Sequence, residues 1–170
     1  MTTAALILSL SLAAFSIIAQ ETKKEFPAAK DTAKPGPTAA DLEAKFKATL
    51  TNAVMDGRFC MLADGKLGPD KDEKYTIVGV EKTGDGQWTI SAKIQYGAMN
   101  FTAPVPVQVK WAGDTPVIIV DNIGFPGTAK YSARVMIYGD TYAGTWSGGD
   151  HGGLMHGVII KAEEKTEEKK

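Results

Sequence analysis

The sequence predicts an all-β fold, an eight-stranded antiparallel up-and-down (meander) barrel with one short N-terminal helix. Apolar and polar residues alternate with a period of two in several segments, and turn-forming residues separate these segments. No stretch between them is long enough for the helical crossover that parallel strands require. A β-sandwich is the alternative. We prefer the barrel because closure of the sheet leaves no exposed edge.

The N-terminus carries an export signal in its composition. An uncharged apolar run, AALILSLSLAAFSIIA, is followed by the charged QETKKEF. The run is short for a membrane span and has the length of a signal-peptide core. We therefore expect residues 1–19 to be a signal peptide and the protein to be exported, either to the periplasm or into the medium. An uncleaved N-terminal anchor is the alternative, and no other membrane-spanning segment is expected.

Two further segments have the composition of unstructured chain. Residues 20–38 are rich in Ala, Lys and Pro and include PGP, which is typical of a flexible linker. Residues 163–170 are a run of mixed charge with no apolar face, which favours a solvated tail. The barrel domain is therefore expected over residues 39–162.

One helix is predicted at the start of this domain, from about Ala39 to Thr51. Thr38 and Asp41 have the spacing of a capping pair. Apolar residues then recur every four positions, at Leu42, Phe46 and Leu50. Such a short helix needs a larger surface to pack against.

Eight strands are predicted after the helix. The alternation is clearest in WTISAKIQY (88–96), VPVQVKW (105–111) and KYSARVMIY (130–138). Weaker candidates are MDGRFCML (55–62), KYTIVGVEK (74–82), TPVIIVDN (115–122), TYAGTW (141–146) and LMHGVIIK (154–161). Pro104 and Pro106 are expected at a strand start or an edge, because proline cannot donate to a ladder.

The alternation directs several aromatic side chains into the barrel. The expected inward set is Trp88, Tyr96, Trp111, Tyr131, Tyr142 and Trp146. In the last strand, His156 shares its face with Leu154, Val158 and Ile160, so it is expected inside as well. The lumen of an eight-stranded barrel is either filled by side chains or holds one small ligand. If it holds a ligand, the expected binding residues are Trp88, Tyr96, Trp111, Tyr131 and Trp146 as walls, with His156 as the polar group.

The stretch SGGDHGG and the histidine after it also contain the elements of a metal site. Its ligands would be Asp150, His151 and His156. The chain has only two histidines, and their spacing matches no established metal motif. A glycine-rich hairpin with one buried histidine is the preferred interpretation, and no cofactor or catalytic residue is predicted.

Charge and cysteine content narrow the function classes. A net charge of −1 provides no basic patch of the kind that nucleic-acid binders carry, so no nucleic-acid partner is expected. The one cysteine, Cys60, lies among apolar residues and is expected to be a buried thiol.

Three segments carry a resemblance to known proteins: VKWAGDTPVI, YSARVMIYGDTYAGTW and GGLMHG. Over residues 46–161 the chain resembles small exported bacterial β-domain proteins of unknown function that end in a Y-A-G-T-W…G-G…G signature. The YAGTW segment is also loosely similar to the closing strands of lipocalin- and avidin-like (calycin) barrels. The resemblance implies export and a compact β domain. It implies no ligand, because MDGRF lacks the tryptophan that lipocalins have near their first strand.

These observations lead to one leading function and two alternatives. The leading expectation is an exported, non-catalytic barrel that binds a small apolar or aromatic molecule. The first alternative is a structural or interaction protein of the cell envelope with a filled barrel and a protein partner that the sequence does not identify. The second is a metal-assisted hydrolase that uses Asp150, His151 and His156.

Overall fold

A computed structural model describes residues 36–124 and 129–162. The predicted signal peptide (1–19), nearly all of the predicted linker (20–38) and the predicted tail (163–170) lie outside the described residues. The described part contains one helix, α1 (Ala39–Leu50), and nine strands: β1 (Ala53–Ala63), β2 (Lys66–Leu67), β3 (Lys71–Gly84), β4 (Gln87–Tyr96), β5 (Met99–Ala112), β6 (Thr115–Gly124), β7 (Lys130–Tyr138), β8 (Thr141–Gly148) and β9 (His151–Lys161).

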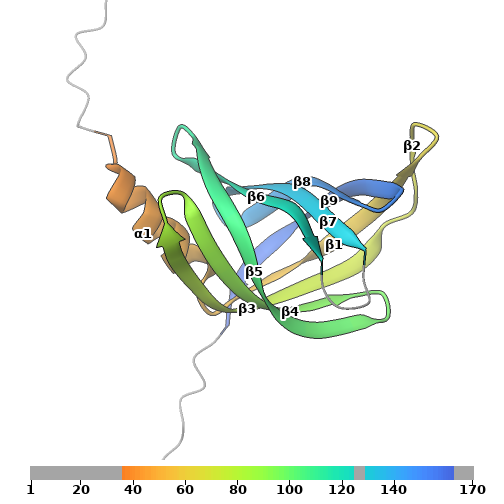
Figure 1. The fold of residues 1–170 in the computed structure, drawn as a ribbon, viewed down its shortest axis with the longest axis horizontal. Coiled ribbons are helices and arrows are strands. Elements are labelled where there is room, and N and C mark those ends of the chain that lie inside the picture. Colours follow the sequence, from red (N-terminus) through yellow and green to blue (C-terminus); the bar gives the residue numbers. More distant parts are fainter. Residues whose placement is uncertain (1–35, 125–128, 163–170) are drawn as a thin grey trace, which may run out of the picture. The chain divides into compact units, whose positions relative to one another are not determined.

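Eight of these strands form a closed antiparallel barrel, as predicted (Figure 1). Each strand from β3 to β8 pairs with the next in the chain, and β1 pairs with β3. The last strand closes the sheet by pairing with β1 from Ala53–Lys161 to Leu62–Gly152. Strand β2 was not predicted, and it extends β1 as a short hairpin beyond the barrel.

The predicted turns and most of the predicted strand faces are correct. Gly86, Gly113 and Gly139, in three of the predicted turns, have positive φ angles. In β4, β5, β7 and β8 the predicted inward residues with described side chains lie in the core or at its border. In β9 the predicted face is wrong: Met155 and Ile159 are buried, whereas Leu154, His156, Val158 and Ile160 are exposed.

Helix α1 closes one end of the barrel. It begins with the predicted capping box. The backbone N–H of Asp41 donates to the Thr38 hydroxyl, and the backbone N–H of Thr38 donates to the Asp41 carboxylate. Its apolar face inserts Phe46 between two tryptophans, at ring-centroid distances of 5.2 Å from Trp88 and 6.4 Å from Trp111. Both contacts are edge-to-face, the geometry that aromatic rings prefer.

Polar contacts fix the same helix at both of its ends. The Lys82 ammonium at the end of β3 lies 2.7 Å from the Glu43 carboxylate. The Lys161 ammonium at the end of β9 donates to the backbone carbonyls of Ala48 and Thr51. These carbonyls lie at the C-terminal end of the helix, where a cation also interacts favourably with the helix dipole.

The ladder between β5 and β6 covers only part of their length. It joins Gln108–Ala112 to Thr115–Ile119, and within the described residues the part of β5 before Gln108 is not paired with β6. Pro104 and Pro106 lie in the part of β5 that precedes it, which fits the prediction of an edge-like position. At the end of β6, the ladder with β7 is interrupted between Val120 and Ile123. The barrel wall is therefore loosened between β5 and β6 on the side away from α1.

No helix in the part of the chain that the structure describes has the length and apolar character of a membrane-spanning helix.

Candidate functional site

The half of the barrel away from α1 contains a cavity of about 360 Å³ that is open to the surface. Its wall consists mainly of apolar side chains that point inward from all eight strands of the barrel, with fewer from β8 and β9 than from the others. Representative wall residues are Ile77, Ile94, Val107, Ile118, Val135 and Met155. Both edges of the loosened β5–β6 seam, including Phe101 and Val120, also line it. The cavity is therefore an apolar chamber inside the barrel.

One part of the wall reaches the surface near the turn between β8 and β9. His151 lines the cavity, yet its side chain is 39% exposed. Trp146 lies beside it, at ring-centroid distances of 5.5 Å from His151 and 5.9 Å from Phe59. The indole Nε1 of Trp146 is buried and has no hydrogen-bond acceptor among residues 36–124 and 129–162. A buried N–H group without an acceptor is unfavourable, so this donor is a local cost to the fold.

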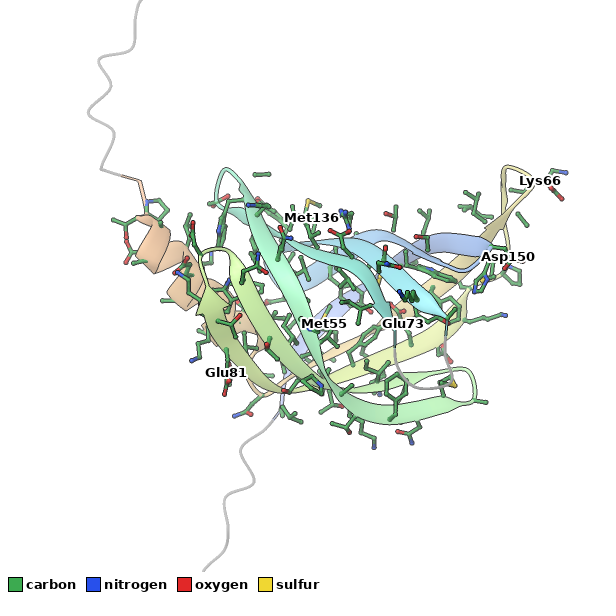
Figure 2. All side chains as sticks on the ribbon, in the orientation of Figure 1. Met55, Lys66, Glu73, Glu81, Met136 and Asp150 are labelled. Atoms are coloured by element: carbon green, nitrogen blue, oxygen red, sulfur yellow. The ribbon has the colours of Figure 1, made fainter. Side chains whose placement is uncertain are left out.

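A carboxyl group also lies in the wall. Glu73, on β3, is only 4% exposed and is the one buried charged residue in the described part of the chain. Its two oxygens accept hydrogen bonds from two tyrosine hydroxyls, Oε1 from Tyr142 and Oε2 from Tyr75, each at 2.9 Å. Figure 2 shows Glu73 and Met55 within the barrel, whereas Met136 and Glu81 point away from it.

The position of Tyr142 depends on a pair of glycines. Glu73, Gly57, Gly157 and Tyr142 are consecutive cross-strand partners on β3, β1, β9 and β8. A Cβ atom on Gly57 would lie 2.3 Å from the Tyr142 hydroxyl, and one on Gly157 would lie 2.7 Å from its Cε1. The tyrosine ring therefore lies across two strands that have no side chain at this level, and its hydroxyl reaches the carboxyl on the third.

Burial is the main influence on the pKa of the Glu73 carboxyl group. Loss of hydration raises the pKa of Glu73, while the hydrogen bonds from Tyr75 and Tyr142 and the charge of His156 oppose the shift. Burial and the adjacent carboxyl also raise the pKa of Tyr142. The raised pKa favours the protonated hydroxyl, which is the form that donates to Glu73.

Glu73 was not predicted as a site residue. The predicted strand began at Lys74, whereas β3 begins at Lys71, so the glutamate was left outside the pattern. In β3 it shares the inward face of Tyr75 and Ile77, and an acidic residue at an inward position was the signal that could have identified it.

The predicted ligand-binding residues are only partly brought together. Tyr131 and Trp146 line the cavity, with their rings 6.5 Å apart. Trp88 is buried against Phe46 at the closed end, and Trp111 is half-buried beside it, so neither lines the cavity. The side chain of Tyr96 lies outside the described part of the structure.

The sixth predicted residue, His156, is on the wrong side of the wall. It is exposed on the outer surface of β9, where it pairs with Ala143 and Arg58. The prediction assigned the faces of β9 from its apolar residues. The inward face instead carries Gly153 and Gly157, because the neighbouring strands leave no room for side chains there.

The predicted metal ligands do not converge. The Asp150 carboxylate lies 3.1 Å from Nδ1 of His151, and this hydrogen bond lowers the pKa of Asp150. His156 is five residues further along β9 and faces the opposite side of the sheet. Within the described residues, no group of three or more potential metal ligands exists. Cys60 is buried and free, as predicted.

The burial of Glu73 predicts a specific pH dependence of stability. Because its pKa in the folded state is raised above the ordinary value of 4.5, the folded state favours the protonated form. The corresponding stabilisation is fully present below pH 4.5 and is lost as the pH rises through the folded-state pKa. We expect the wild type to gain stability relative to Glu73→Gln as the pH is lowered from about 8 to about 4.5, measured by urea unfolding.

The control for this comparison is Asp72→Asn, which removes the adjacent carboxyl at an exposed position. The same pH-dependent difference between wild type and Asp72→Asn would show that Glu73 is not its source.

Comparisons with protein-family models, with curated proteins and with solved structures found no match to this chain.

Proposed function

We propose that this protein is a non-catalytic binding protein that holds a small, mainly apolar molecule inside its barrel. The observation that supports this most directly is the cavity of about 360 Å³, which lies within the range of ligand pockets, about 300–1,000 Å³. Export forms part of the proposal and rests on the composition of residues 1–19 alone.

The chemistry of the wall supports an apolar ligand. Binding would remove apolar surface of both the ligand and the aliphatic side chains from water, and this removal has a favourable free energy. Tyr131 and Trp146 add aromatic faces. This combination of an apolar wall and a few polar groups is typical of sites that bind small molecules.

The alternative, a structural or interaction protein with a filled barrel, has less support. A filled lumen would leave no space of this size among the inward side chains. A metal-assisted hydrolase has the least support of the three, because His156 faces the opposite side of the sheet from His151.

The proposal is tested by filling the cavity. Ala133 lines it from β7, opposite Trp146 in the ladder, whereas Ala143 on β8 is exposed on the outer surface. We expect the neutral dye N-phenyl-1-naphthylamine to become fluorescent on binding the wild type. Ala133→Phe is expected to weaken binding by about tenfold or more, because the added ring occupies the ligand's space.

Ala143→Phe is the matched control and is expected to bind the dye as the wild type does. Equal binding of the dye by the two variants would contradict the proposed function, and so would a wild type that binds neither the dye nor the octyl compounds tested below.

A further inference from the structure

Glu73 places an ionisable carboxyl group in a cavity whose wall is otherwise mainly apolar. The cavity lining contains only one carboxyl group, that of Glu73, and no lysine or arginine among the described residues. The other ionisable side chains that line it are His151 at the surface and the hydroxyls of Tyr75 and Tyr131. When Glu73 is ionised, it is therefore the one negatively charged side chain among the described residues of the lining.

The carboxylate keeps unused acceptor capacity. Among the side chains that the structure describes, Tyr142 donates one hydrogen bond to Oε1 and Tyr75 donates one to Oε2, and each carboxylate oxygen has two lone-pair sites. The two tyrosines also hold the group in a fixed orientation. Tyr142 is itself held by the Gly57–Gly157 pair beneath it. The site is thus pre-organised to accept a further hydrogen bond.

None of the lysine and arginine ion pairs in the described part of the chain involves Glu73, and the only charge that favours its ionised form is that of His156, on the outer face of β9. The described lysine and arginine ion pairs join Arg58 to Asp72, Lys74 to Asp56, Lys82 to Glu43 and Arg134 to Asp121. All four pairs consist of partly or largely exposed side chains, away from the cavity. A buried carboxylate is costly without an opposite charge, so a cation delivered by a ligand would stabilise it.

We propose that Glu73 is the anchor for a cationic group, and that the molecule held in the barrel is a small amine with an apolar body. The ammonium donates to the carboxylate of Glu73, and the apolar body lies against the aliphatic and aromatic wall. This inference rests on the proposed function and adds the class of ligand to it.

The test compares three ligands of equal length that differ only in their terminal group: octylamine, octan-1-ol and octanoate. Binding is measured by calorimetry at about pH 8, where a primary amine is protonated. We expect octylamine to bind the wild type about tenfold or more tightly than octan-1-ol, because its hydrogen bond to Glu73 is charge-assisted. Octanoate is expected to bind most weakly, because it places a second negative charge beside the first.

Glu73→Gln identifies the residue responsible. Glutamine has the same shape and can bond to both tyrosine hydroxyls, so the variant retains the geometry without the charge. We expect it to bind octylamine and octan-1-ol with equal affinity. Asp72→Asn changes the net charge by the same amount at an exposed position and is expected to retain the preference for the amine.

The outcomes separate the two proposals. If octylamine and octan-1-ol bind the wild type equally, or if Glu73→Gln retains the preference, the inference is wrong while a binding function stands. If N-phenyl-1-naphthylamine and all three octyl compounds fail to bind, the binding function itself is wrong.

Discussion

Replacement of Phe46 by alanine is expected to lower the free energy of unfolding by about 3–5 kcal/mol. The side chain is 2% exposed and makes edge-to-face contacts with both Trp88 and Trp111. Truncation removes these contacts and leaves a void between the helix and the barrel, which a short helix cannot close by itself. Urea unfolding, followed by circular dichroism and by tryptophan fluorescence, measures the change.

Lys45→Ala is the matched control on the same helix, since this side chain is exposed. Its effect is expected to stay within about 0.5 kcal/mol. A loss for Phe46→Ala that is no larger than this would mean that α1 does not stabilise the barrel. A loss of the predicted size would identify the helix as an integral part of the domain.

Replacement of Gly57 by alanine is expected to lower the free energy of unfolding by about 1–3 kcal/mol or more. The new Cβ would lie 2.2 Å from the carbonyl oxygen of His156 and 2.3 Å from the hydroxyl of Tyr142. The first of these atoms belongs to the backbone of β9, so relief of the clash requires the closing strand to move. The second is the donor to Glu73, so the carboxyl would lose one of its hydrogen bonds.

Gly79→Ala provides the comparison within a strand. A Cβ there would meet Ser91 Cβ at 3.7 Å, an ordinary contact, and Gly79 does not have a positive φ angle. Alanine is therefore expected to be neutral or slightly stabilising, as it usually is relative to glycine inside a strand. Equal effects at the two positions would show that Gly57 has no special packing role. Both variants are compared by thermal and urea unfolding.

The strands show what a local pattern can predict. In β4 and β7, one face is apolar at nearly every position, so the alternation identified the inward residues correctly. In β9, three apolar residues lie on the outer face, and they are exposed: Leu154 at 38%, Val158 at 46% and Ile160 at 51%. The prediction followed hydrophobicity, and hydrophobicity was misleading there.

The candidate site was predicted less well than the fold. Tyr131 and Trp146 were placed at the cavity because their strands have a regular alternation. Trp88 and Trp111 also point inward, but they pack against Phe46, a residue distant in sequence. Which inward aromatic residues fill the core and which line the cavity depends on which of them α1 contacts through Phe46. The period of a strand contains no information on this contact.

The sequence by itself determined the barrel, its capping helix and the inward faces of most strands, because these follow from local periods, caps and turn residues. Only the tertiary structure decided the face of β9, the cavity and the position of Glu73. Those features depend on partners on separate strands: Tyr142 reaches Glu73 only because Gly57 and Gly157 meet between them in the closed barrel. Closure brings β9 against β1, and this pairing of distant segments creates the site.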